Sequence, residues 1–599
     1  MRSLPHVLLG ALLLAACTPS APPATTPSMS ATDAGVGRAL EAGGVYWGDR
    51  RPATFPAAWP HKAGGAASFG AQAMIASDAP LATEAGLEIL RAGGNAVDAA
   101  VATGFALAVV YPEAGNLGGG GYMVIRMADG RTAAIDYREK APGRASRDMY
   151  IGPDGNLTGA SVVGPLASGV PGAVAGMLEA HARYGKLPLH EVMKPAHRYA
   201  ELGFVVDSAL YRSLRGAQRL ITQFGGKDIF YPNGEALAPG TTFRQPALAA
   251  TLRRIVALGA DGFYKGVTAK AIADEMRRLG GIITEEDLAA YKPAWREPVR
   301  ATYRGHTLVS MPPSSSGGTT MAQTLNILEG LPVSPFGSTT WAHHLASAYQ
   351  RAFLDRNTHL GDPDFVRIPM SRMLSKEYAA ELRATIGRDR ATPTSQLSPL
   401  QAASANEPTE TTHYSVVDAE GSAVSTTTTI NALYGSGVYV AEVGFFLNDE
   451  MDDFAAQPGK PNMFGLVQGE ANAIAPHKRM LSAMTPTIVL SPNDSVYLVV
   501  GARGGPRIIT STSQIILNVI DQRMTLADAM SAPRLHHQSL PDTIRYERNG
   551  LEPAVLESLS RMGYGFTTGG IGLANGIMRV PGGWHGLSDP RGSGNAIGY

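Results

Sequence analysis

The chain has 599 residues, with 51 Lys and Arg against 51 Asp and Glu, so its formal net charge at pH 7 is zero. This balance excludes global electrostatic attraction to nucleic acid or other polyanions, because such attraction needs an excess of one sign. Hydrophobic residues make up 44% of the chain and charged residues 17%, which suits a large folded core and excludes a disordered polyampholyte.

The first segment in chain order is typical of an export signal. Residues 7–16 (VLLGALLLAA) are apolar, too few to span a bilayer but enough for the hydrophobic region of a secretion signal. Leu-Ala-Ala then precedes Cys17, the only cysteine, and this resembles a bacterial lipoprotein signal, in which the cysteine is lipidated. We therefore predict a signal peptide over residues 1–17, with an ordinary signal and an incidental cysteine as the alternative. A lone cysteine also excludes disulfides within the chain and metal sites built from several cysteines.

The next segment predicts a tether. Residues 18–30 hold four Pro and six Ser or Thr, a composition that cannot bury a core. We expect tether and linker over residues 18–70. The expected location is the periplasm or the outer membrane, with lipid at Cys17 as the only membrane contact.

From residue 71 onward, the pattern predicts an α/β (α+β) fold with antiparallel hairpins. Apolar spacing predicts helices over Pro80–Val110, interrupted at Gly93-Gly94-Asn95. Alternation predicts paired strands over Tyr122–Arg126 and Thr132–Tyr137. Helical patterns dominate 173–290 and 340–390, and short β-branched runs recur at 411–417, 423–430, 486–490 and 496–500.

The glycine-rich run Gly115–Gly121 is not a phosphate-binding loop. Its spacing is neither GxGxxG nor GxxxxGK[ST], and we expect a strand after it instead of a helix. Close packing of backbones is the preferred interpretation. The chain contains no HExxH or GxSxG motif, and we expect no metal and no cofactor.

A hairpin is the informative feature of the C-terminal third. Residues 411–417 lead through the turn Asp418–Gly421 into residues 423–431. If the turn is centred near residue 420, facing residues have numbers that sum to about 840, which places Thr411 opposite Thr429. Period-two alternation then puts Thr429 and Asn431 on one face. A Thr-rich strand on a solvated face fits the same pattern.

Several motifs in this order resemble the γ-glutamyltranspeptidase family over roughly residues 71–599. They are GGNAVDAAVA (93–102), GNLGGGGYM (115–123), AIDYREKAP (134–142), LASGVPG (166–172), MPPSSSGG (311–318), LGDPDF (360–365), TTHYSVVD (411–418), NDEMDDF (448–454), GARGG (501–505), APRLHHQ (532–538) and SDPR (588–591). The resemblance implies an N-terminal-nucleophile hydrolase, a four-layered αββα sandwich. It also implies autocleavage between Glu410 and Thr411, with a large subunit over 71–410 and a small subunit over 411–599 that form a heterodimer.

The implied reaction uses Thr411 as nucleophile. A terminal threonine carries a free α-amine with a reference pKa of about 7.7–8.0, so it can be its own general base near neutral pH. The resemblance assigns the oxyanion hole to the backbone N–H groups of Gly504 and Gly505 and the orientation of Thr411 to Thr429. The expected activity is that of a γ-glutamyltransferase and glutathione hydrolase acting on small γ-glutamyl amides.

The resemblance also assigns substrate recognition. Arg138 and Ser482 match residues that bind the substrate α-carboxylate, and Asn431, Glu450 and Asp453 match those that take the α-ammonium. Ala483 stands where the family usually has a second serine, so one hydroxyl contact is missing. Phe464 matches a lid position that is tyrosine in several bacterial members, and Arg503 adds a cation beside the glycines.

Two alternatives stay open. One is a related acylase that removes glutaryl side chains from β-lactam amides with the same machinery. The other is a surface lipoprotein that kept the fold for binding and lost catalysis, against which the presence of Thr411, Thr429, Gly504 and Gly505 argues.

Overall fold

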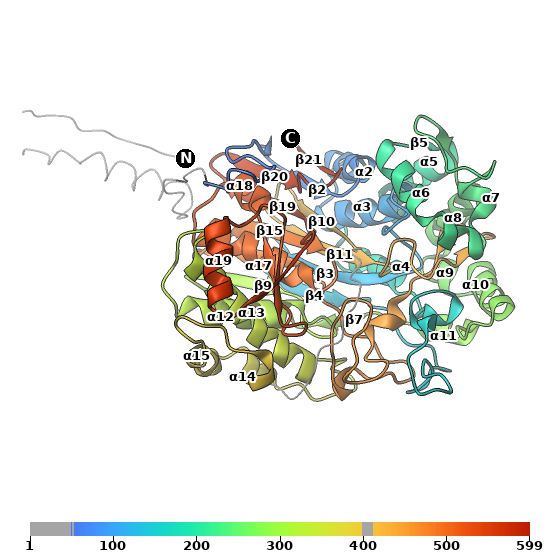
Figure 1. Ribbon diagram of the computed structural model, residues 1–599. Helices are drawn as coiled ribbons and strands as arrows, with labels where there is room; N and C mark the ends of the chain where they lie inside the picture. The colour runs from blue at the N-terminus through green and yellow to red at the C-terminus, as the bar shows by residue number, and fades with distance from the viewer. Residues whose placement is uncertain (1–49, 51–52, 398–410) are drawn as a thin grey trace, which may run out of the picture. The chain divides into compact units, whose positions relative to one another are not determined.

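Two seven-stranded antiparallel sheets form the centre of the computed structural model, which describes residues 50, 53–397 and 411–599 (Figure 1). The first sheet runs in the order β1 (Ser68–Gly70), β20 (Gly583–Ser588), β19 (Leu573–Val580), β15 (Val496–Arg503), β14 (Thr487–Leu490), β9 (His306–Ser310) and β8 (Val299–Tyr303). The second runs in the order β21 (Asn595–Gly598), β2 (Met74–Ser77), β10 (Thr412–Val417), β11 (Ala423–Thr429), β3 (Gly120–Arg126), β4 (Thr132–Asp136) and β7 (Ala294–Arg296).

The two sheets pack face to face and helices cover both outer faces. Strands β10 and β11 contact β15 across the sheet interface. The second sheet is covered by α2 (Pro80–Arg91), α3 (Ala96–Val110) and α4 (Ala173–Tyr184), and the first by α12 (Gly317–Glu329), α17 (Arg507–Ile520) and α18 (Leu526–Ser531). This confirms the predicted four-layered αββα sandwich. Every residue of β10 and β11 is buried, as expected for strands covered on both faces.

The remaining elements surround these layers. The other helices are α5 (Leu189–Leu202), α6 (Ser208–Gln223), α7 (Lys227–Phe230), α8 (Pro246–Leu258), α9 (Asp261–Tyr264), α10 (Gly266–Leu279), α11 (Glu285–Ala290), α13 (Thr339–His359), α14 (Met370–Met373), α15 (Lys376–Ala384), α16 (Thr394–Leu397) and α19 (Pro553–Arg561). Three small sheets comprise β5 (Phe204–Val205) with β6 (Thr242–Phe243), β12 (Tyr439–Val440) with β13 (Phe445–Phe446), and β16 (Leu535–His536), β17 (Thr543–Tyr546) and β18 (Gly565–Thr568).

Local signals placed the first helices and strands correctly. Helix α3 begins after Asn95, whose side chain accepts from the N–H groups of Val97 and Asp98 while the Asp98 carboxylate accepts from the Asn95 N–H, a capping box. The predicted strand pair at 122–137 is β3 with β4. As expected, the glycine run packs closely: a Cβ on Gly119 would overlap the backbone oxygen of Thr429.

The N-terminal boundary differs from the expected linker over residues 18–70. Strand β1 pairs with β20 at the edge of the first sheet, and the buried Trp59 donates from Nε1 to the Ser531 oxygen at 2.9 Å. The end of the expected linker is therefore part of the folded domain, because it supplies an edge strand and an apolar anchor. Cys17 and Glu410 lie outside the described residues.

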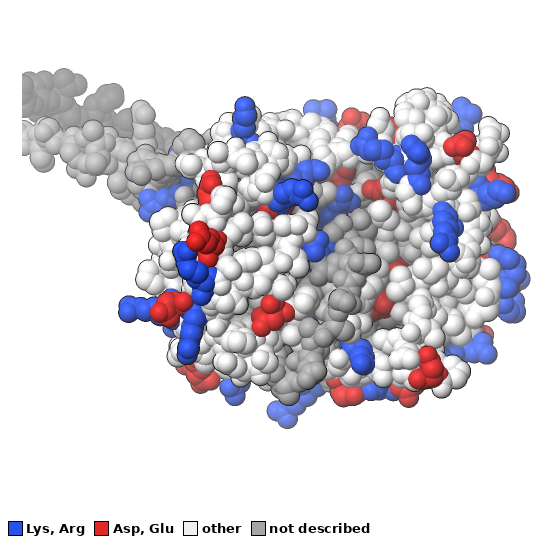
Figure 2. All heavy atoms as spheres, in the orientation of Figure 1, with Lys and Arg blue, Asp and Glu red and all other residues white. Residues whose placement is uncertain are grey.

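The surface agrees with the balanced composition. On the face shown in Figure 2, Lys and Arg side chains are interspersed with Asp and Glu. Within the described ranges, no helix has the length and apolar character needed to cross a membrane.

Candidate active site

Thr411 lies directly before β10, at the centre of the second sheet. Its side chain is buried, and its hydroxyl donates to Thr429 Oγ1 at 3.4 Å. The β10–β11 ladder pairs Thr412 with Thr428 and continues to Val417 with Ala423, so the paired numbers sum to 840. This confirms the predicted hairpin register. Thr429 Oγ1 also accepts from the Asn431 N–H at 2.8 Å, which fixes the Thr429 side chain beside Thr411.

Two distant side chains hold the start of β10 in place. Asp78 Oδ2 accepts from Thr412 Oγ1 at 2.9 Å and from the His413 N–H at 3.4 Å. Asn575 donates from Nδ2 to Asp78 Oδ1 at 3.0 Å and to the His413 oxygen at 2.7 Å. Sequence reasoning missed Asp78 and Asn575, because their connection to Thr411 exists only after the two sheets pack.

The two predicted oxyanion glycines form the turn between β15 and α17. Gly504 has φ 130° and Gly505 has φ 57°, backbone conformations that favour glycine. A Cβ on Gly505 would lie 2.7 Å from the Phe464 ring, so the turn and the predicted lid residue are in close contact. The N-terminus of α17 follows at once, and its partial positive charge favours an anion at this position.

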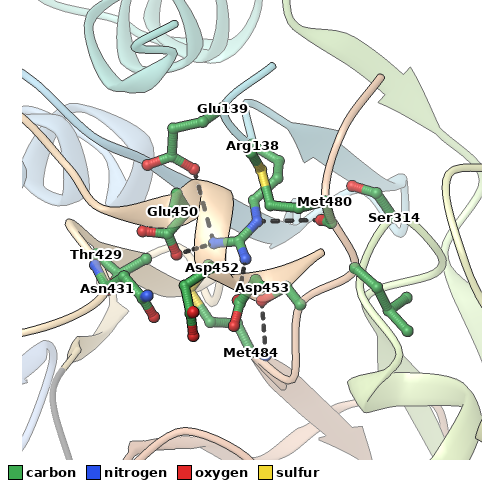
Figure 3. A network of polar contacts seen from close by, with 12 residues as sticks. Arg138, Glu139, Ser314, Thr429, Asn431, Glu450, Asp452, Asp453, Met480 and Met484 are labelled. Carbon is green, nitrogen blue, oxygen red and sulfur yellow. Dashed lines mark hydrogen bonds and ion pairs between the residues drawn. The ribbon is translucent and has the colours of Figure 1, made fainter. Parts of the chain in front are cut away.

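A buried charge network lies next to Thr429 (Figure 3). The guanidinium of Arg138, which is fully buried, pairs with the carboxylates of Glu450 and Asp453, and its Nε donates to the Met480 oxygen at 3.3 Å. Glu139 is also buried, 3.6 Å from Arg138 Nη1. One cation is therefore surrounded by three carboxyl groups.

Burial determines the protonation of the acids around this network. It raises the pKa of Glu139 to about 8, although the neighbouring Arg138 lowers it. Burial likewise raises the pKa of Asp452 to about 6. Burial also raises the pKa of Glu450 and of Asp453, although Arg138 opposes the shift in both. All three acids beside Arg138 therefore have a pKa above the ordinary range, and Glu450 and Asp453 are the two that contact its guanidinium directly.

The threonines, the charge network and the glycine turn enclose one cavity with an empty volume of about 320 Å³. Its lining residues are Arg138, Arg356, Thr411, Thr429, Asn431, Glu450, Asp453, Phe464, Leu466, Ser482, Ala483, Met484, Gly505, Pro506 and Ile508. Ten of the residues expected at the site thus line it together, and Gly504 directly precedes the lining residue Gly505.

Four further residues lie in or near the cavity. Asn431 has φ 73° and donates from Nδ2 to the Asp449 oxygen at 3.1 Å. Ser482 Oγ accepts from the Met484 N–H at 3.1 Å. Arg503 does not line this cavity; its guanidinium donates to the Tyr111 hydroxyl. Sequence reasoning missed Arg356, which lies on α13 in a part of the chain that the quoted motifs do not cover.

The arrangement can support acyl transfer to a hydroxyl. A paired threonine hydroxyl, a glycine turn at a helix N-terminus and a buried cluster of one cation and several acids share one small cavity. The cluster suits a zwitterion, whose carboxylate and ammonium groups match the two signs of charge.

Comparison with known proteins agrees with this geometry. Residues 82–599 match the family described as Gamma-glutamyltranspeptidase. The chain is 46% identical over 527 residues to "Glutathione hydrolase proenzyme" of Escherichia coli (strain K12), covering 87% of this chain and 90% of that protein. It is 41% identical over 476 residues to "Acylase ACY 1 proenzyme" of Pseudomonas sp. (strain SE83), covering 78% and 82%.

A solved structure extends the comparison to the fold. The crystal structure of cephalosporin acylase from Bacillus halodurans superposes with a TM-score of 0.78 at 27% identity, covering 91% of this chain and 99% of that one. The family match spans most of the chain and includes every residue that lines the cavity. The chain therefore belongs to the γ-glutamyltranspeptidase family.

Proposed function

We propose that this protein is an autoprocessed γ-glutamyltransferase and glutathione hydrolase with Thr411 as its nucleophile. The observation that carries the proposal is the position of the Thr411 hydroxyl, 3.4 Å from Thr429 Oγ1 in a cavity that also holds the Arg138 charge network. The substrates are small γ-glutamyl amides, and the large and small subunits derive from one precursor.

In the precursor, the Thr411 hydroxyl attacks the carbonyl carbon of Glu410. The peptide bond breaks as an ester forms, and the Thr411 nitrogen takes a proton to become a free amine. Water then hydrolyses the ester, leaving the Glu410 carboxylate and a free Thr411 hydroxyl. The new α-amine is the general base that the internal residue lacked.

In the mature enzyme, the α-amine accepts the proton of the Thr411 hydroxyl as its oxygen attacks the γ-carbonyl of the donor. The N–H groups of Gly504 and Gly505 stabilise the negative oxygen of the tetrahedral intermediate. The protonated α-amine returns the proton to the leaving amine, and a γ-glutamyl ester of Thr411 remains. Water or the amino group of an acceptor attacks this ester and restores Thr411.

The charge network recognises the rest of the donor. The α-carboxylate binds to Arg138 and Ser482. The α-ammonium donates hydrogen bonds to Asn431, Glu450 and Asp453, and the two carboxylates also attract its positive charge. The carboxylates that pair with Arg138 become partners of the substrate ammonium. A zwitterion can thus enter without leaving either sign of charge unpaired.

Autocleavage and catalytic turnover, measured in the same variants, test whether Thr411 is the nucleophile. Thr411→Ala removes the attacking oxygen, so we expect a single inactive chain on denaturing gels. Thr411→Ser retains a hydroxyl and should process and keep reduced activity, because it loses the methyl group that restricts χ1. Thr429→Ala should process but turn over poorly. An active wild type that stays one chain, or cleavage and turnover by Thr411→Ala, would refute the mechanism.

The acylase is the second candidate, favoured by the similarity to two acylases. A γ-glutamyl anilide and a glutaryl anilide both carry the terminal carboxylate and differ only in the α-amino group, which glutaryl lacks. Glutaryl lacks the ammonium that Glu450 and Asp453 would accept, so we expect the γ-glutamyl donor to have the higher kcat/KM. The reverse order would identify an acylase.

The proposed location is outside the cytoplasm, with a lipid anchor at Cys17. The apolar run before this cysteine and the tether composition after it support the proposal. Because Thr18 is not an aspartate, outer-membrane retention is favoured over the inner membrane. Mass spectrometry of native protein should find a lipidated Cys17, and an unmodified N-terminus further along the chain would exclude the anchor.

A further inference from the structure

A second buried guanidinium, Arg356, lines the same cavity as Arg138. Arg356 lies near the C-terminal end of α13 and is 1% exposed. Burial lowers the pKa of its guanidinium to about 10, so the side chain is still charged at neutral pH. The cavity therefore contains two arginine charges, of which the family motifs quoted above include only one.

Every hydrogen-bond partner that Arg356 has among the described residues is neutral. Its Nε donates to Ser316 Oγ at 3.0 Å, and its Nη1 donates to Asn357 Oδ1 at 2.9 Å and to Gln468 Oε1 at 3.1 Å. Across residues 53–397 and 411–599, no carboxylate is within ion-pair distance of this guanidinium, and its Nη2 makes no hydrogen bond. Asp453 acts on it only through longer-range attraction.

Arg138 is in the opposite situation. Its two terminal nitrogens already pair with Glu450 and Asp453, and Glu139 is 3.6 Å away. A carboxylate that approaches Arg138 alone therefore meets a guanidinium whose two terminal nitrogens already have carboxyl partners. A buried cation without a counter-ion, such as Arg356, is unfavourable until an anion binds to it.

Residue 483 increases the need for a second cation. Ala483 lines the cavity but has no hydroxyl, so of the two neighbouring residues only Ser482 offers an O–H donor. The set of neutral donors available to a bound carboxylate is correspondingly small. Arg356 supplies both a positive charge and an unused Nη2 donor.

We infer that Arg356 is a second binding residue for the α-carboxylate of the donor, alongside Arg138. The inference rests on the proposed function and extends it. Arg138 keeps Glu450 and Asp453 in place for the α-ammonium, and Arg356 supplies the charge that the α-carboxylate needs. The preference for donors with a free α-carboxylate then depends on Arg356.

Two donors that differ only in this group test the inference. γ-Glutamyl p-nitroanilide carries the α-carboxylate, and 4-aminobutyryl p-nitroanilide lacks it but keeps the amine. In Arg356→Gln, we expect KM for the γ-glutamyl donor to rise by at least about tenfold and that for the 4-aminobutyryl donor to change by less than about threefold. Inhibition constants of L-glutamate and 4-aminobutyrate provide the same comparison without turnover.

A second variant neutralises the charge and leaves Arg356 in place. Gln468→Glu puts a carboxylate against Arg356 Nη1 with little change of side-chain volume, and Gln468→Met removes the same amide without adding charge. Gln468→Glu should reproduce the donor-selective loss, and Gln468→Met should not. The two Gln468 variants test whether Arg356 binds the α-carboxylate even if Arg356→Gln fails to fold or to process.

The outcomes separate the two proposals. A correctly processed wild type that does not turn over the γ-glutamyl anilide would refute the proposed function. An active wild type in which Gln468→Glu, and Arg356→Gln where it folds, weaken both donors equally would overturn the inference, because Arg356 would then be structural only. A donor-selective loss supports it.

Discussion

Burial gives Arg138 a role in the stability of the protein as well as in substrate binding. Its guanidinium is fully buried between Glu450 and Asp453, so replacing it with alanine would leave two buried carboxylates without a counter-ion. Removing one member of a buried ion pair typically costs about 3–5 kcal/mol. We therefore expect Arg138 substitutions to change stability as well as substrate binding, which thermal midpoints and KM values of the variants would measure separately.

Ala483 provides a milder test at the residue scale. Ala483→Ser adds a hydroxyl to the cavity wall beside Ser482, where it can donate to the substrate α-carboxylate. A neutral hydrogen bond contributes about 0.5–1.5 kcal/mol, so KM for a γ-glutamyl anilide should fall by about two- to tenfold. The measurement is a comparison of steady-state KM values in the processed enzyme.

The 4-aminobutyryl anilide is the control for this variant, because it has no α-carboxylate and its KM should not change. An unchanged KM for the γ-glutamyl donor, or an equal decrease for both donors, would show that residue 483 does not face the carboxylate.

At the scale of the element, the β10–β11 hairpin could be predicted because its register is local. A short turn links the two strands, and alternation determines which side chains share a face. The Thr411–Thr429 contact follows from that register. The other contacts of this site do not follow from the register, because Asp78 lies directly after β2 and Asn575 lies on β19 of the first sheet.

His413 on β10 gives a pH prediction. It is fully buried, bonded to Thr427 Oγ1 at 2.8 Å and Ser415 Oγ at 3.1 Å, and burial lowers its pKa from 6.5 to about 3. Between those values the unfolded chain binds more protons than the folded one. His413 should therefore reduce stability as pH falls from 6.5 toward 3, by up to about 1.4 kcal/mol per pH unit.

His413→Gln is the matched variant, since glutamine can hydrogen-bond but does not titrate. Thermal midpoints of both proteins at pH 7, 6, 5 and 4 should converge as pH falls. Glu139 acts in the opposite direction, because its folded pKa of about 8 makes the folded state bind more protons between its ordinary range and pH 8. That contribution is common to both proteins, so parallel pH profiles would show that His413 is not held neutral.

At the scale of the whole molecule, both sheets mix strands from before and after residue 411. In the second sheet β10 lies between β2 and β11, and β11 in turn pairs with β3. In the first sheet, β14 pairs with β9. If the chain is cleaved after residue 410, neither product can keep its own sheets complete.

We therefore expect the two subunits to stay together after processing. They should elute as one species in size-exclusion chromatography, even after dilution to nanomolar concentration, and separate only where the protein unfolds in urea. Thr411→Ala, expected to be unprocessed, is the control of equal mass. Elution of separate folded subunits under native conditions would contradict this expectation.

The sequence alone determined the features that depend on neighbouring residues: the capped helix α3, the strand pair β3–β4, the hairpin register and the ordered motifs that indicate the family. Local geometry and short-range patterning are sufficient for these. Tertiary structure decided the rest. Only in the folded protein does β1 pair with the first sheet and do Asp78 and Asn575 contact the start of β10. The same is true of the carboxyl groups around Arg138 and of the position of Arg356 in the same cavity. These contacts join segments hundreds of residues apart, and their energetics depend on burial, which no local pattern of residues specifies.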